Sequence, residues 1–373
     1  MAVRMIFASL LAAAIAACDR VPEQPRSSDF AVLAQAAEGY ARAENGAVLQ
    51  FPRDHGEHPD FRIEWWYLTA NLQDEQGRSY GAQWTLFRTA VKPPEPGAPP
   101  GVEGNRQIYM AHFALTWPDG HTAFQRYARG GHSPEASRAG VTSSPFFAWL
   151  DDWTLRSLAP GWLPLEARAR QDGYRLELNL DSQLPLVLQG ENGFSQKHPQ
   201  GGGSYYYSQP FLAASGTLTI ADETLPVSGQ AWLDHEWSSQ FLQEDQAGWD
   251  WFALHLESGE KLMLFRLRER QPGDTGNYRH GVLISPTGES TVLDPARIRF
   301  QVAGTQPVAG RTLPLHWNIS LPEIGRELEI RAIRADQWMD VDFPYWEGAV
   351  TLTGETAGSR GTGYMELTGY PRD

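Results

Sequence analysis

Cysteine is almost absent from this chain, because Cys18 is the only one among 373 residues. A single thiol excludes an internal disulfide, so the folded part must be held together by its hydrophobic core. Basic patches are also missing, since the formal net charge is -14 and no basic stripe runs along any segment. This charge argues against nucleic acid as a partner and indicates mainly a well-solvated acidic surface.

The sequence also lacks the short motifs of several common enzyme classes. It contains no G-x-S-x-G nucleophile elbow, no phosphate-binding P-loop and no G-x-G-x-x-G fingerprint. Metal-binding spacings such as H-x-H and H-E-x-x-H are missing too. The sequence therefore predicts no metal site and no cofactor.

No hydrophobic run is long enough to cross a bilayer, which needs about 20 apolar residues. The run Met5–Ala17 follows Arg4 and matches the hydrophobic region of a secretory signal peptide. It ends in I-A-A-C, which resembles the lipobox of bacterial lipoproteins, where the cysteine carries the lipid. An ordinary cleaved signal with a stray cysteine is the alternative. We expect residues 1–18 to be a lipoprotein signal peptide, with Cys18 as the lipidation site.

The residues that follow the signal suggest a location. Asp19 directly after the cysteine resembles the retention signal of inner-membrane lipoproteins, and the polar segment 20–28 has the composition of a tether. We therefore expect a periplasmic protein anchored to the inner membrane through Cys18, in preference to the outer membrane.

The rest of the chain is dominated by short β-type segments separated by turn residues, a pattern typical of antiparallel barrels and sandwiches. Residues 29–45, rich in alanine with apolar residues three and four apart, predict a short helix. The stretch 92–104, rich in proline and glycine, predicts a long loop. The expected strands include 63–72, 80–91, 107–117, 174–181, 216–221, 248–257, 260–269, 326–333, 346–354 and 363–370.

One short pattern occurs twice along the chain. Residues 64–68 read E-W-W-Y-L and are followed, after a turn, by L-F-R at 86–88. Residues 250–254 read D-W-F-A-L and are followed by L-F-R at 264–266. The match favours a duplicated β-domain over a chance similarity of two aromatic hairpins.

The roughly 350 residues after the signal suit two domains better than one. We expect a tether and helix at 19–50, a first β-domain at 51–240 and a second at 241–373. The 14 tryptophans are unusually many, and this residue type is well suited to line an apolar ligand cavity.

The stretch G-Q-A-W-L-D-H-E-W places three titratable side chains in what is otherwise a core strand, where an unpartnered charge costs several kcal/mol. With a period of two, Trp232, Asp234 and Glu236 share one face, while His235 and Trp237 share the other. Two carboxyls about 6–7 Å apart along a strand can hold a proton at neutral pH. The alternative is a structural network of hydrogen bonds and ion pairs that joins two domains.

Three further titratable residues lie on apolar strands. Glu64 needs a partner, for which Arg62 and Arg88 are the candidates. His112 lies within Y-M-A-H-F-A-L, where a lone histidine is more often a core residue than a catalyst. Asp250 shares its face with apolar residues, so it is either a candidate proton donor or a buried anchor.

Four segments together resemble the AttH-like family, which shares a superfamily with the bacterial carotenoid 1,2-hydratases (hydroxyneurosporene synthases). They are H-P-D-F-R-I-E-W-W-Y-L-T-A-N-L, G-Q-A-W-L-D-H-E-W, G-W-D-W-F-A-L and G-Y-M-E-L-T-G-Y, and the resemblance runs from Phe51 to Tyr370. It implies a mostly β fold of two lipocalin-like antiparallel β-barrel domains, with the short N-terminal helix after the signal peptide. More distant relatives include fungal pericyclases, or Diels-Alderases.

The resemblance implies an apolar cavity near or between the two barrels. In the carotenoid hydratases it implies cofactor-free addition of water to a double bond, begun by protonation. The positions that match this acid chemistry, and are therefore the candidate catalytic residues, are Asp234, His235, Glu236 and Asp250. The residues expected to bind the ligand are Glu64, Trp65, Trp66, Tyr67, His112, Trp232, Trp237, Trp249 and Trp251.

Three functions remain open. The first is an acid-dependent hydratase or isomerase-type lyase that acts on a hydrophobic, isoprenoid-like molecule. The second is a lipid-binding or hydrophobe-binding subunit associated with an ABC-type permease. The third alternative is a secreted hydrolase that uses two carboxylates. The lipoprotein signal departs from the hydratase pattern and fits the exported AttH-like branch, so the sequence leaves open whether the protein is an enzyme.

Overall fold

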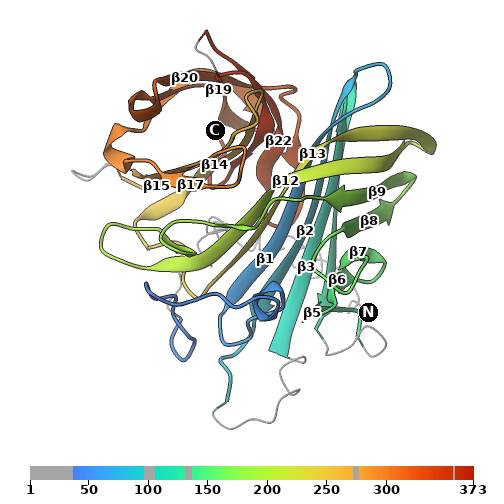
Figure 1. Ribbon diagram of the computed structural model, residues 1–373, viewed down its shortest axis with the longest axis vertical. Coiled ribbons are helices and arrows are strands. Elements are labelled where there is room, and N and C mark those ends of the chain that lie inside the picture. The colour runs from blue at the N-terminus through green and yellow to red at the C-terminus, as the bar shows by residue number, and fades with distance from the viewer. Residues whose placement is uncertain (1–36, 96–105, 131–136, 272–276, 356–357) are drawn as a thin grey trace, which may run out of the picture.

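The structure is a computed structural model that describes residues 37–95, 106–130, 137–271, 277–355 and 358–373. The expected lipoprotein signal, Cys18, Asp19 and the tether lie outside these residues, as does most of the loop 92–104. Among the described residues, no helix is long and apolar enough to span a membrane. The mostly β fold with two curled antiparallel sheets is confirmed (Figure 1).

The helix expected at 29–45 is not formed over 37–45, the part that the structure describes. This segment makes turns and lies against the first sheet instead. The Ala41 N–H donates to the Asp60 carbonyl at 2.9 Å, and the Tyr40 hydroxyl donates to the Ala90 carbonyl at 2.9 Å. Hydrogen bonds and packing against the sheet therefore outweigh a local preference that is weak in a short alanine-rich segment.

The first sheet has the strand order β4-β3-β2-β1-β13-β12-β9-β8-β7-β6-β5, and β10 and β11 pair with β12. A short 3-10 helix, η2 (Arg53–His55), precedes it. Its strands are β1 (Ile63–Gln73), β2 (Ser79–Ala90), β3 (Gln107–Trp117), β4 (Gly120–Arg129), β5 (Ala139–Ser143), β6 (Phe146–Leu150), β7 (Trp153–Ser157), β8 (Leu165–Gln171), β9 (Tyr174–Asp181), β10 (Val187–Leu188), β11 (Phe194–Gln196), β12 (Gly203–Ile220) and β13 (Glu223–Ser238).

The second sheet has the order β17-β16-β15-β14-β23-β22-β20-β19-β18, with β21 paired to β22. Figure 1 views this sheet nearly end-on, as an orange to red ring beside the blue and green first sheet. Its elements are β14 (Gln246–Leu256), β15 (Lys261–Glu269), β16 (Tyr278–Ile284), β17 (Ser290–Val292), η4 (Pro295–Arg297), β18 (Arg299–Val308), β19 (Arg311–Leu321), η5 (Pro322–Ile324), β20 (Arg326–Ala332), β21 (Trp338–Met339), β22 (Tyr345–Thr353) and β23 (Gly361–Leu367).

Both sheets share one arrangement around the repeated sequence pattern. The strand β1 lies between β2 and β13, and β14 lies between β15 and β23. Within the two hairpins, Glu64 pairs with Arg88 and Asp250 pairs with Arg266. The acidic residue and the arginine of the pattern therefore meet across the same ladder in each sheet.

Strand alternation divides the apolar side chains among separate cores. Trp66 and Leu68 of β1 join the core inside the first sheet, and Phe252 and Leu254 of β14 join the core inside the second. Tyr67 and its neighbours on the opposite face of β1 pack instead against residues of the second sheet. Because successive strand residues point to opposite faces, one run of aromatic residues fills a barrel and also builds the contact between the two barrels.

Candidate functional site

A cavity of about 160 Å³ lies between the two sheets. An apolar cavity of roughly 150 Å³ stays dry and binds benzene, so this one suits an apolar group of similar size. A whole long-chain lipid would not fit. The aromatic residues of its wall are Trp65, Tyr67, Phe87, Tyr206, Phe241, Trp249, Trp251, Phe265, Phe343 and Tyr345.

Charged side chains from both sheets also border this cavity. Asp234 and Glu236 reach it from β13, Glu366 reaches it from β23, and Lys197 reaches it from the loop after β11. A fourth acid at the cavity, Glu64, is neutralised by Arg88. The other three carboxyl groups beside one ammonium group in an apolar interior cannot all ionise cheaply. The arrangement therefore favours a proton retained on one of the acids.

Asp234 is fully engaged as a hydrogen-bond acceptor. It accepts from Ser208 Oγ at 2.5 Å, from the Tyr206 hydroxyl at 2.7 Å and from Trp232 Nε1 at 2.6 Å. Burial raises the pKa of Asp234 to about 7, while these three bonds oppose the rise. Three donors aimed at one carboxyl group suit its ionised form, so Asp234 is placed to accept rather than to donate a proton.

Glu236 is paired with a buried lysine. Lys197 Nζ lies 2.7 Å from Glu236 Oε1 and donates to Ser195 Oγ at 3.1 Å. The ammonium group lies 4.4 Å from the centre of the Phe265 ring, a distance typical of cation–π contacts. Burial lowers the pKa of Lys197, and the charge of Glu236 opposes that shift.

Glu366 faces a second acid across the neighbouring strands. It pairs in register with Glu347 of β22, and Gln83 Nε2 donates to Glu347 at 2.7 Å. Burial, together with the charges of Asp234 and Glu236, raises the pKa of Glu366 to about 8. Burial and the charge of Glu366 raise the pKa of Glu347 as well. Since like charges directly opposite each other repel, the pair retains a proton at neutral pH.

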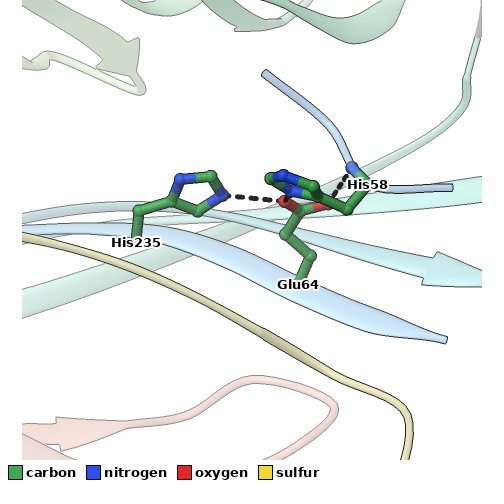
Figure 2. Close-up of side chains that lie close together, drawn as sticks. All are labelled: His58, Glu64 and His235. Atoms are coloured by element: carbon green, nitrogen blue, oxygen red, sulfur yellow. Dashed lines mark hydrogen bonds and ion pairs between the residues drawn. The ribbon is translucent and has the colours of Figure 1, made fainter. Parts of the chain in front are cut away.

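The other face of β1 and β13 carries a separate polar cluster, shown in Figure 2. Glu64 Oε1 lies 2.7 Å from His235 Nε2 and 2.6 Å from His58 Nδ1. Arg88 Nε donates to Glu64 Oε2 at 2.7 Å. Burial alone would raise the pKa of Glu64, but the charges of His58 and Arg88 hold it well below its usual value. Burial lowers the pKa of His235 to about 4, which leaves this imidazole neutral.

The structure brings together only part of the predicted catalytic set. Asp234 and Glu236 both border the cavity, but His235 lies on the opposite strand face and is not among the described lining residues. Asp250 is not among them either, because it points into the second barrel. There it contacts Arg266 Nη2 at 2.6 Å and accepts from the Tyr370 hydroxyl at 2.7 Å.

The predicted ligand-binding residues divide in the same way. Trp66 stacks on His235 and Trp237 stacks on His58, and neither tryptophan lines the cavity. Trp232 does not line it either, although its Nε1 donates to Asp234. The residues of this set that do line the cavity are Glu64, Trp65, Tyr67, His112, Trp249 and Trp251.

Sequence reasoning missed three charged residues of the site, namely Glu366, Glu347 and Lys197, as well as several apolar residues of the wall. For Glu366 a signal was present. It lies in G-Y-M-E-L-T-G-Y and pairs with Trp251 in the second sheet, as Glu236 pairs with Trp65 in the first. Applying the duplicated pattern to the last strand of each sheet would have found it. Lys197 lies in an irregular loop with no comparable signal.

The fold and site define a double β-barrel protein with a buried apolar cavity that is bordered by acids. The model of the AttH-like family matches residues 42–370. The chain therefore belongs to the AttH-like family, and the resemblance found in the sequence is confirmed.

Solved structures agree with this assignment. A protein from Nitrosomonas europaea assigned to AttH is 36% identical with a TM-score of 0.76, over 89% of this chain and 100% of that one. Kievitone hydratase from Nectria haematococca is 17% identical with a TM-score of 0.63, over 90% and 98%. CghA in complex with Sch210972 is 16% identical with a TM-score of 0.53, over 90% and 97%. The last two similarities show the shared fold. A search of curated proteins gave no match.

Proposed function

We propose that this protein is a hydratase-type lyase that adds water to a double bond in a small apolar, isoprenoid-like group. The observation that carries the proposal is the Glu347–Glu366 pair, whose residues lie directly opposite each other on neighbouring strands and which places Glu366 at the wall of an aromatic cavity. A carboxylic acid that stays protonated near neutral pH is the kind of general acid that such chemistry needs. Kievitone hydratase, a protein named for a hydration, has the same fold and lends support.

The proposed step begins with transfer of the Glu366 proton to one carbon of the double bond. The other carbon becomes a carbocation, which the faces of Trp65 and Trp251 in the wall stabilise through cation–π attraction. A water molecule then forms a bond to this carbon, and the proton that it loses returns to the carboxylate pair. One water is added across the double bond, and the acid is regenerated.

The cavity volume limits the size of the substrate group that can enter it. A space of about 160 Å³ holds a group comparable to benzene, such as the end of a prenyl chain. We propose that the reacting group is the terminal prenyl unit of a larger molecule, whose remainder lies outside the cavity.

The location and partners are a further part of the proposal. The lipobox-like segment at residues 1–18 supports a periplasmic lipoprotein held at the inner membrane through Cys18. An apolar substrate partitions into that membrane, so an anchored enzyme would meet it there. Association with an ABC-type permease belongs to the same proposal and rests on the resemblance to exported AttH-like proteins.

The proposal is tested with the protein and a panel of molecules that end in a prenyl unit, in isotopically labelled water, with products followed by mass spectrometry. The expected result is incorporation of one labelled water, with loss of at least about 100-fold in rate for Glu366→Gln. Glu223→Gln, on the exposed start of β13, is the matched control and should keep full activity. Full activity of Glu366→Gln would overturn the assignment of the acid. Stoichiometric binding of the panel without turnover would instead support a hydrophobe-binding subunit.

A further inference from the structure

A polar cluster on the strand face opposite Asp234 has no role in the proposed hydration. It consists of His58, in the irregular segment before β1, Glu64 on β1 and His235 on β13 (Figure 2). Their side chains come from three separate elements and converge on one point. One nitrogen or oxygen atom from each lies within 4.8 Å of the others.

The donor atoms are those of a metal site. Two imidazole nitrogens and one carboxylate oxygen are preferred ligands of Zn²⁺, and this His₂Glu set leaves room for water in the remaining position. His58 Nδ1 lies 2.6 Å and His235 Nε2 lies 2.7 Å from Glu64 Oε1. Tetrahedral Zn²⁺ at about 2.0–2.1 Å from each ligand would place neighbouring donors about 3.3 Å apart. Side-chain shifts of under about 1 Å would therefore admit the ion.

Each ligand has an outer partner that fixes its orientation. His58 Nε2 lies 3.4 Å from Asp54 Oδ1, which is the carboxylate–histidine arrangement that supports metal-binding histidines. His235 Nδ1 lies 3.1 Å from the Tyr207 hydroxyl, so Nε2 can be free of a proton. Glu64 Oε2 is held by Arg88, and this leaves Oε1 directed at the two rings.

Aromatic packing holds both imidazole rings in place. Trp237 stacks on His58 with 3.9 Å between ring centres and 4° between the planes. Trp66 stacks on His235 at 4.5 Å. Both rings are thus preorganised, which lowers the entropy cost of binding an ion.

His58 is the most exposed member of the cluster. The side chains of Glu64 and His235 are 0% and 1% exposed, whereas that of His58 is 16% exposed. The cluster is therefore largely shielded from solvent, with His58 at its edge, which is a suitable surrounding for a bound metal.

We propose that His58, Glu64 and His235 bind a divalent transition metal, with Zn²⁺ as the ion that fits best. The ion joins the segment before β1 to the paired strands β1 and β13. The sequence did not reveal this site because its ligands are separated by 5 and by 170 intervening residues, so no local spacing marks it.

The experiment uses the folded chain after treatment with a chelator and titrates it with Zn²⁺ in a calorimeter. A parallel titration with Co²⁺ follows the visible absorption of tetrahedral cobalt. The expected result is one ion per chain, with the affinity lowered by more than about 100-fold in His58→Asn. Asp54→Asn, which removes only an outer partner, should lower it by about 10–100-fold.

His316→Asn is the matched control, because His316 Nε2 contacts Glu329 Oε1 at 2.9 Å in the second sheet without a second imidazole. It should bind Zn²⁺ with unchanged affinity. Failure of the wild-type chain to bind Zn²⁺ or Co²⁺ would overturn the proposal, as would binding that His58→Asn leaves unaltered. His235→Asn should also lose Zn²⁺ binding. If this variant does not fold, His58→Asn alone tests the metal site, because His58 lies outside the strands. Glu366→Gln should bind Zn²⁺ normally, so this test is independent of the proposed hydration.

Discussion

The carboxylate of Glu64 lies 2.7 Å from Arg88 Nε, and neither side chain is exposed. The second barrel repeats this relationship, because Arg266 Nη2 lies 2.6 Å from the unexposed carboxylate of Asp250. Each pair stands at the same place in its hairpin, whose first strand is hydrogen-bonded to β13 in the first sheet and to β23 in the second. The repeated sequence pattern therefore corresponds to a repeated buried ion pair.

Arg88→Met should destabilise the protein strongly. The guanidinium group donates to Glu64, to Gln107 and to the carbonyls of His58 and Phe61, and its removal takes the permanently charged partner from a buried carboxylate. Breaking one side of a buried ion pair costs about 3–5 kcal/mol. Urea unfolding at neutral pH measures the loss.

The control for this experiment is Arg138→Met. Arg138 pairs with Asp151 at the surface, where its side chain is 70% exposed, and solvent screens such pairs. Its unfolding midpoint should match that of the wild type. An Arg88→Met midpoint equally close to the wild type would contradict the prediction.

The contribution of Glu366 to stability should fall as the pH rises from about 5 to about 8. The pKa of Glu366 is raised from 4.5 to about 8, so the folded state binds this proton more tightly than the unfolded chain does. The stability that the proton contributes is fully present below about pH 4.5 and is lost as the pH rises through about 8.

Glu366→Gln removes this titration. In the middle of the window the free energy of unfolding of the wild type minus that of Glu366→Gln should fall by up to about 1.4 kcal/mol per pH unit. Urea unfolding over a pH series measures both slopes, with Glu223→Gln as the surface control. Equal slopes in Glu366→Gln and the wild type would show that Glu366 does not hold the proton.

Gly81→Ala should weaken the contact between the barrels. A Cβ atom at Gly81 would lie 2.5 Å from the Tyr364 hydroxyl and 3.2 Å from Ala349 Cβ, so the strands would have to separate. Overpacking of this kind costs about 1–3 kcal/mol. Tyr364→Phe removes the hydroxyl and should restore most of that stability in the double variant, as thermal unfolding can check. A Gly81→Ala protein as stable as the wild type would refute the close approach.

Cys18→Ser should release the protein from the membrane. The lipobox-like segment predicts that Cys18 carries the lipid anchor, and stable attachment depends on that lipid. Fractionation of cells should then find the wild type with membranes and the variant in the periplasmic fraction. Equal membrane association of both would contradict the lipoprotein prediction.

Several strands could be read from local pattern alone. The segments expected at 107–117 and 174–181 coincide with β3 and β9, because their alternation and flanking turns are local features. The strand β12 was expected only at 216–221, although it begins at Gly203. Both faces of its first half are largely buried, and this hides the alternation that marks a strand.

The sequence by itself determined which side chains share a strand face. Asp234 and Glu236 point to one face of their strand and His235 points to the other, because the two-residue period of a β-strand is a property of the backbone. Only the tertiary structure decided which faces meet. Glu366 comes close to Asp234 and Glu236, and His58 comes close to His235, through the pairing and packing of strands distant in the chain. Such contacts depend on how whole sheets close and pack, and no local spacing encodes them.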